Sequence, residues 1–358
     1  MQILDDIKYG FDDLAICPCR SEAASRKDVS LIREFKLRSG ATISGFPFIA
    51  ANLDTTGVFE VAKELKEFKA FTCLHKFYPI EELYRWWSSE SWVNEYCFYT
   101  IGLRQEEYIK LKEFCNICGY VPKLLAIDVP NGYSHFFSEY VRKIKDEFNP
   151  QCLMVGNVVT SSMAQELVIG GGADIIKIGI SNGSLCKTYF QTGVFYPQLS
   201  ACIESANAVH GLKAHICSDG GCKSFGDVAK ALCAGADLVM GAGLINGSEE
   251  CQGEWTYKSE IIWKDKNHPM LGQATYTGRE IKDKLKSYGM SSTEAMEKYY
   301  GKVDNYRTSE GDCQLIEYKG PVKNIIQNMM GALRSTGAYI GASSLKDFSK
   351  CCTFIKIH

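Results

Sequence analysis

The chain has 358 residues, of which 46% are apolar and 23% charged, and its formal net charge is −2. This length suits one α/β barrel with insertions, and the balance is typical of a soluble globular protein with a large core. Because there is no basic surplus, the composition argues against a nucleic-acid-wrapping protein. The start, residues 1–6, lacks the basic and apolar parts of a secretory signal, and no apolar run is long enough to span a membrane. We therefore expect a cytosolic protein with neither a nucleic-acid nor a membrane partner.

Sixteen cysteines are scattered along the chain, and several lie inside apolar runs, such as Cys73, Cys152 and Cys233. In a chain of this size such cysteines usually act as small core hydrophobes in a reducing compartment. Cys115 and Cys118 have C-x-x-C spacing, but no second pair follows at zinc-finger distance. We therefore expect that pair to pack in the core rather than to bind a metal.

Short apolar, β-branched runs alternate with amphipathic helical patterns over most of the chain. This alternation predicts βα units and a parallel sheet, and eight candidate strands favour a closed (β/α)₈ barrel over an open sheet. We expect one domain over residues 1–358. The predicted strands are 46–51, 70–74, 96–101, 123–127, 151–155, 174–178, 214–217 and 236–240, and the predicted helices are 58–68, 79–87, 106–118, 134–148, 162–169, 196–210 and 226–234.

Polar or glycine-rich residues follow most of the predicted strands. In a barrel all of these strand ends lie on one rim, where binding and catalytic groups collect. Any single Asp or Asn there is more simply explained as a helix N-cap, but their number together favours a site. The residues in question are Asn52, Asp54, His75, Lys76, Gly102, Asp128, Asn131, Gly132, Asn157, 179–186, 218–221 and 241–243.

Two glycine-rich turns, 219–221 and 241–243, follow the last two predicted strands. Glycine lets backbone N–H groups approach an anion closely, and the loops after strands seven and eight of a barrel commonly bind phosphate. The alternative is that these glycines only form tight turns. Their pairing and position favour the phosphate site.

Cys186 lies in a loop of glycines and short polar residues beyond the sixth predicted strand. It is the one cysteine set among such residues on the expected catalytic rim. A nearby Lys187 and backbone donors would activate a thiolate nucleophile, although most exposed cysteines are inert. We predict a catalytic loop over residues 179–192.

The alternation breaks after residue 250. Residues 252–286 are charged, aromatic and poorly periodic, and the segments 288–292 and 306–311 follow. This composition suits a flap over 252–311 that excludes water and completes the site. The alternative is an unusually long solvated connection.

These segments together resemble the GMP reductase branch of the IMP dehydrogenase/GMP reductase family over nearly the whole chain. Within that family, the segments 288–292 and 306–311 look like the reductase rather than the dehydrogenase. No paired regulatory domain is inserted between strands two and three. The matching segments are 9–13, 50–55, 128–133, 156–160, 192–198, 218–222, 288–292, 306–311 and 353–355.

The resemblance implies that Cys186 attacks C2 of GMP, that ammonia leaves, and that NADPH delivers hydride to give IMP. Thr188 and Glu310 match the family pair that provides the proton for the amine. It also implies a homotetramer and a K⁺ site on carbonyls of Gly179, Ser181 and Gly183. Substrate contacts are implied for Ser184, Asp219, Gly220, Gly221, Ala242, Gly243, Met290, Ser291, Ser292, Arg307, Ser309 and Gly311, of which Met290, Ser291, Ser292 and the 307–311 loop match base contacts. Cofactor contacts are implied for Lys76, Asp128, Asn131, Gly132 and Ser335.

The chain departs from the family pattern near the nucleophile. Ser181 and Ala242 each replace a glycine, Tyr189 replaces an arginine, and the 252–286 excursion is longer than usual. Two other functions therefore stay open: a diverged enzyme acting on another purine nucleotide or oxidising IMP with NAD, and a nucleotide-binding sensor or scaffold. Retention of Cys186 with Thr188 and Glu310 favours the enzyme.

Overall fold

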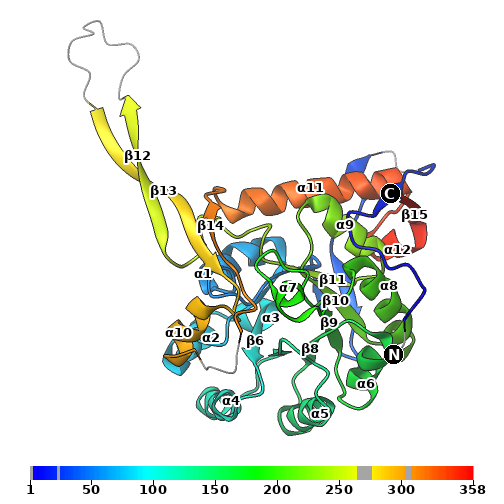
Figure 1. The fold of residues 1–358 in the computed structure, drawn as a ribbon, viewed down its shortest axis with the longest axis horizontal. Coiled ribbons are helices and arrows are strands. Elements are labelled where there is room, and N and C mark those ends of the chain that lie inside the picture. The colour runs from blue at the N-terminus through cyan, green and yellow to red at the C-terminus, as the bar shows by residue number, and fades with distance from the viewer. Residues whose placement is uncertain (1–2, 22–24, 264–275, 304–307, 358) are drawn as a thin grey trace, which may run out of the picture.

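The computed structural model describes residues 3–21, 25–263, 276–303 and 308–357. Its barrel strands are β4 (Phe48–Ala50), β5 (Phe71–Cys73), β6 (Cys97–Ile101), β7 (Leu124–Asp128), β8 (Cys152–Val158), β9 (Ile175–Ile178), β10 (His215–Asp219) and β11 (Leu238–Gly241). They pair in parallel in the closed order β10–β11–β4–β5–β6–β7–β8–β9, with helices on the outside (Figure 1). The predicted strands and the (β/α)₈ barrel are thereby confirmed.

Helices follow the barrel strands and cover their outer side, and all seven predicted helical segments are confirmed. The long helix α11 (Val322–Ile340) was not expected; it packs against the first and last of the predicted helices. Its buried residues recur every three or four positions, which gives it one apolar face. The remaining outer helices are α1 (Phe59–Leu65), α2 (Ile80–Ser89), α3 (Val93–Tyr96), α4 (Gln105–Cys118), α5 (Phe137–Phe148), α6 (Ser161–Ile169), α8 (Gln198–Val209) and α9 (Phe225–Cys233), with 3₁₀ extensions η2 (Lys66–Phe68) and η3 (His210–Leu212).

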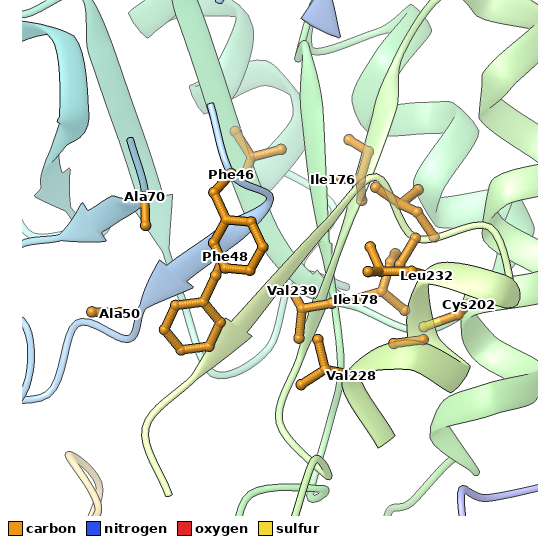
Figure 2. Close-up of a cluster of buried hydrophobic side chains, with 14 of the residues drawn as sticks. Phe46, Phe48, Ala50, Ala70, Ile176, Ile178, Cys202, Val228, Leu232 and Val239 are labelled. Carbon is orange, nitrogen blue, oxygen red and sulfur yellow. The ribbon is translucent and has the colours of Figure 1, made fainter. Parts of the chain in front are cut away.

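Side chains alternate along each barrel strand between the interior and the surrounding helices, as the pleat of a strand requires. In β9, Ile175 belongs to the inner core, so Lys177 two positions later also points inward. Ile176 and Ile178, which alternate with Ile175 and Lys177, pack outward. Figure 2 shows this outer core where β4, β9 and β11 meet α8 and α9: Phe48, Ile176, Ile178, Cys202, Val228, Leu232 and Val239.

The amino end of the barrel is closed by a hairpin of β2 (Arg33–Lys36) and β3 (Thr42–Gly45). Its Phe35 and Ile43 pack with the inner residues of the strands. The two chain ends pair through the antiparallel strands β1 (Leu14–Cys17) and β15 (Thr353–Lys356). Along the chain, the short helix η1 (Arg26–Asp28) follows β1, and η4 (Leu345–Asp347) and α12 (Phe348–Cys351) precede β15.

The excursion after residue 252 contains regular structure that its pattern did not reveal. Strands β12 (Trp255–Trp263), β13 (Tyr276–Tyr288) and β14 (Cys313–Glu317) form an antiparallel sheet whose β12–β13 ribbon projects away from the barrel (Figure 1). A projecting ribbon has solvent on both faces, so it lacks the apolar alternation of a half-buried strand. Helices α7 (Thr188–Thr192) and α10 (Thr293–Tyr300) lie in the predicted catalytic loop and flap. Among the described residues, no helix is long and apolar enough to cross a membrane.

Candidate active site

The glycine turns predicted to bind phosphate lie against the loop that carries the cysteine. A Cβ on Gly220 would lie 3.0 Å from the Gly183 amide nitrogen, and one on Gly243 would lie 3.5 Å from Ser184 Oγ. Gly220 and Gly221 have φ angles of +84° and +82°, which only glycine adopts readily. Within the described residues, the amides of Gly221 and Gly243 donate to no protein group. Free amides on converging loops are the donors that an anion needs.

Cys186 lies in line with two polar groups. Its Sγ is 3.2 Å from Thr188 Oγ1, and Thr188 Oγ1 donates to Glu310 Oε2 at 2.7 Å. Because the one hydroxyl proton of Thr188 is directed at Glu310, its oxygen is left to accept from the Cys186 thiol. The sequence suggested that Lys187 lies near the thiol, but its Nζ pairs with Asp312 Oδ1 at 2.5 Å.

Backbone pairing brings the predicted base-binding turn, residues 289–292, beside the nucleophile. The Glu310 amide donates to the Ser291 carbonyl at 3.1 Å, and the Glu310 carbonyl accepts from the Lys187 amide at 2.7 Å. Three segments distant in the sequence therefore run side by side. Met290, half-buried, lies within the turn.

Other predicted substrate and cofactor residues have internal partners. Ser292 is fully buried and its Oγ accepts from the Ala295 amide, so it caps α10. Ser309 Oγ donates to the Gly311 carbonyl at 3.0 Å. Ala242 forms a turn by accepting from the Ile245 and Asn246 amides. Ser335 lies on the outer helix α11 and bonds to Gly331, and Arg307 lies outside the described residues.

A buried lysine joins two of the predicted carboxylates across the barrel mouth. Lys177 Nζ lies 2.5 Å from Asp128 Oδ1 and 2.8 Å from Asp219 Oδ2. Amide groups hold the same carboxylates: Asn52 donates to Asp128 and Asn157 to Asp219, each at 2.9 Å. Burial would raise the pKa of Asp128, but Lys177 and Asn52 hold it below its ordinary value. Burial would lower the pKa of Lys177, but the two carboxylates raise it, so both signs of charge persist.

Lys177 was missed by the sequence analysis, although a signal was present. A lysine inside the apolar run 175–178, two positions from an inward-facing Ile175, must point into the barrel. Gly156 on the neighbouring strand leaves the space for it, because a Cβ there would come within 2.5 Å of Lys177 Cβ. A charge at an inward position near the mouth is an indicator of a site.

The residues predicted for the cofactor follow β5 and β7 at the same rim. Lys76 Nζ pairs with Glu107 at 2.8 Å, Asn131 Oδ1 accepts from the Tyr133 amide, and the Gly132 amide donates to the Asn157 carbonyl. The Asp128 side chain stays 29% exposed although its oxygens are held in place. A fixed, partly exposed carboxylate fits the hydroxyl groups of a ribose.

The loop predicted to hold a monovalent cation uses its carbonyls internally. The Gly179 carbonyl accepts from Asn157 Nδ2 at 2.7 Å, and the Gly183 carbonyl accepts from the Cys186 amide at 3.0 Å. Ser181 keeps a left-handed φ of 64° in place of the family's glycine, and its Oγ accepts from the Tyr189 amide. The Gly179 and Gly183 carbonyls thus accept one hydrogen bond each, and each oxygen keeps a second lone pair that a cation could use.

Comparisons with known proteins show the family of this chain. A sequence model of the IMP dehydrogenase / GMP reductase domain matches residues 99–358. A GMP reductase of Onchocerca volvulus is 42% identical over 361 residues, covering 99% of this chain and 92% of that protein. Human GMP reductase 2 is 42% identical over 354 residues, covering 99% and 95%, and a GMP reductase of Photobacterium profundum is 41% identical over 363 residues, covering 100% and 97%. With this domain match, these identities and the (β/α)₈ barrel, the chain belongs to the IMP dehydrogenase/GMP reductase family of enzymes.

Proposed function

We propose that this enzyme reduces GMP to IMP and ammonia with NADPH, through a covalent bond between Cys186 and purine C2. The observation that carries the proposal is the line from Cys186 Sγ through Thr188 Oγ1 to Glu310 Oε2, with contacts of 3.2 and 2.7 Å. The names of the relatives support the substrate. The choice of NADPH over NADH follows the family resemblance.

The line of hydrogen bonds supplies a balanced proton path. The Cys186 thiol proton passes through Thr188 to the Glu310 carboxylate, and the thiolate adds to C2 of GMP. The proton then returns through Thr188 to the departing amine, which leaves as ammonia, and C2 stays bonded to sulfur with a C=N double bond. A bound nicotinamide cofactor supplies the hydride that C2 must accept. The C–S bond then breaks, IMP leaves, and the Cys186 thiolate takes up a proton from solvent to become the thiol again.

Binding groups surround this path. The free amides of Gly221 and Gly243 would hold the phosphate, and Asp219, paired with Lys177, would accept from the ribose hydroxyls. Asp128 and Lys76 would face the nicotinamide side. The carbonyls of Gly179, Ser181 and Gly183 would hold K⁺ if it binds, because a carbonyl that accepts one hydrogen bond keeps a second lone pair.

We further propose that the protein is a cytosolic homotetramer built from one domain per chain. Its sixteen free cysteines suit a reducing compartment. Exposed apolar side chains, including Phe190 at 82%, offer surface to neighbouring subunits. Light scattering on the purified protein tests the tetramer, since a monomer of 39.9 kDa would contradict it.

The activity is tested by incubating the purified protein with GMP and NADPH. We expect cofactor oxidation with IMP and ammonia formed in equal amounts. Cofactor reduction with IMP and NAD, in the absence of any reaction with GMP, would show a dehydrogenase instead. Nucleotide binding without turnover of any purine nucleotide would show a sensor.

A further inference from the structure

A buried carboxylate lies outside the groups used above. Asp54 follows β4, and its side chain is only 3% exposed. Its Oδ2 accepts three hydrogen bonds: from Tyr288 Oη at 2.7 Å, Lys298 Nζ at 2.9 Å and Tyr299 Oη at 2.7 Å. So many donors on one oxygen fix the positions of all the groups that carry them.

The three donors stand on both sides of the predicted base-binding turn. Tyr288 is the last residue of β13, directly before the turn, whereas Lys298 and Tyr299 belong to α10, which begins directly after it. Asp54 thus closes a loop around residues 289–292 from the barrel side. Both ends of the turn share one anchor.

Helix α10 depends on such contacts, because only two of its eight residues are buried. Two further contacts of α10 are aromatic and involve Phe77 after β5 and Arg104 after β6. The rings of Phe77 and Tyr299 stack with centroids 3.6 Å apart, and the Arg104 guanidinium lies 3.7 Å from the centre of the Tyr300 ring. These contacts hold the far end of α10. Asp54 contacts both α10 and β13, which Lys298 Nζ and Tyr288 Oη also join directly at 3.0 Å.

The turn in question is packed against the nucleophile's backbone. The Gly289 amide donates to the Asp312 carbonyl at 3.0 Å, and the Asp312 amide donates to the Leu185 carbonyl at 2.8 Å. A Cβ on Gly289 would come within 2.8 Å of that same Leu185 oxygen. A shift of the turn would therefore disturb the segments that carry Cys186 and Glu310.

The charges of the cluster are stable around neutral pH. Burial would raise the pKa of Asp54, but Lys298, Tyr299 and Tyr288 together hold it below its ordinary value. Burial would lower the pKa of Lys298, but Asp54 and the tyrosines raise it. The pKa of Tyr288 is raised to about 12, chiefly by burial. The phenols therefore keep the protons that they donate.

We propose that Asp54 is a positioning residue that holds the 289–292 turn in the geometry that receives the purine base. It acts through Tyr288, Lys298 and Tyr299 and does not itself touch the substrate. This inference rests on the proposed function for its substrate, because the turn is a base-binding element only if a purine nucleotide binds there.

The test compares Asp54→Asn with Asp174→Asn in the full-length protein. Asp174 is a matched control, because it is also buried (1% exposed), pairs with one lysine, Lys145, at 3.0 Å and accepts from a backbone amide. It lies at the amino end of β9, away from the flap. Both variants remove one buried charge, so both should lower the melting temperature. If Asp54→Asn does not fold, Tyr299→Phe removes one donor and keeps the ring stacked on Phe77.

We expect Asp54→Asn to raise KM for GMP between about 10-fold and 100-fold, the effect of a small misplacement of a binding group. The kcat value should fall less, KM for NADPH should not change, and Asp174→Asn should change neither KM. Amide hydrogen exchange over residues 289–300 should speed up in the Asp54 variant alone. Equal KM values in the two variants, or unchanged exchange at 289–300, would overturn the proposal.

A failure of the proposed function looks different. In that case the unmodified protein would not turn over GMP at all. The Asp54 proposal is then judged by calorimetric dissociation constants for GMP and IMP together with hydrogen exchange. Weaker nucleotide binding and faster exchange in the Asp54 variant alone would support it, and values equal to those of the Asp174 variant would overturn it.

Discussion

The two ends of this barrel carry similar charged clusters in opposite settings. At the amino end, Asp237 is 1% exposed and pairs with Arg33, His210 and His215, and its remaining partner is the Ile216 amide. At the carboxyl end, Lys177 pairs with Asp128 and Asp219, whose side chains stay 29% and 19% exposed. The first cluster lies under the β2–β3 hairpin, whereas the second opens to the mouth.

This difference shows how the same kind of buried ion pair stabilises the fold at one end and prepares a binding site at the other. Both oxygens of Asp237 are occupied by protein donors. Asp219 accepts its two hydrogen bonds through Oδ2 alone within the described residues, which leaves Oδ1 for a ligand. A carboxylate that binds a ligand needs one oxygen that no protein group occupies. The predictions below test whether function belongs to the mouth alone.

The largest effect is expected for Cys186→Ser at the mouth. A serine hydroxyl lacks the thiol's acidity and nucleophilicity, so turnover of GMP should fall by about 1,000-fold or more. The melting temperature and GMP binding should hardly change, since the side chain is only half-buried. Turnover that survives this substitution unaltered would contradict the covalent mechanism.

Glu310→Gln should have the next largest effect. The amide keeps the size of the side chain but cannot take up a proton from Thr188, so kcat should fall by about 100- to 10,000-fold. KM should change little, because the group acts in proton transfer rather than in binding. A matched variant, Thr188→Val, removes the 2.7 Å link to Glu310 and should give a similar kcat. An unchanged kcat in both would exclude the proposed proton path.

A pair of variants compares the two ends directly. Lys177→Met and Asp237→Asn each break a buried ion-pair cluster, which costs about 3–5 kcal/mol of unfolding free energy. Only Lys177→Met should also weaken nucleotide binding, because it leaves Asp128 and Asp219 facing each other unneutralised. Denaturant unfolding and calorimetric binding measure the two quantities. Loss of nucleotide binding in the Asp237 variant would contradict the proposal that binding depends on the carboxyl end alone.

The smallest effects concern pH, and they should have opposite signs at the two ends. At the mouth, burial lowers the pKa of His75 from 6.5 to about 4, so the unfolded chain binds more protons between these values. The free energy of unfolding should therefore fall as pH drops through this window, by at most about 3 kcal/mol. His75→Gln should flatten that acid limb in urea titrations.

At the amino end the sign is reversed. Burial would lower the pKa of His215, but Asp237 raises it above 6.5, so the folded chain binds the extra proton. Its contribution is complete below pH 6.5 and is lost as pH rises through the folded pKa. His215→Gln should remove that loss and leave the acid limb of His75 unchanged. The same pH dependence in both variants would contradict the assignment.

Much of the barrel was predictable because its strands and helices follow local periodicities. Apolar spacing predicts a strand over residues 174–178 and a helix over residues 226–234, and the structure confirms both. Helix α11 was not predicted because it follows the long excursion, where strands and helices no longer alternate in the sequence. Strands β12 and β13 were missed because a solvated ribbon has no apolar face.

The candidate site was predictable in part. The sequence by itself determined which loops meet at the rim, because parallel strands all end on the same side of a barrel. It also marked Cys186 by its glycine-rich loop. The family resemblance added Thr188 and Glu310, whose roles stay predictions.

Only the tertiary structure decided which side chains face one another. Thr188 and Glu310 are 122 positions apart, and Asp54 and Tyr299 are 245 apart, so no local pattern relates them. The pairing of Lys187 with Asp312 rather than with the thiol was likewise beyond the sequence. Periodicity specifies the face on which a residue lies, but its partner depends on barrel closure and on the backbone pairing of residues 289–292 and 310–312 with the Cys186 loop.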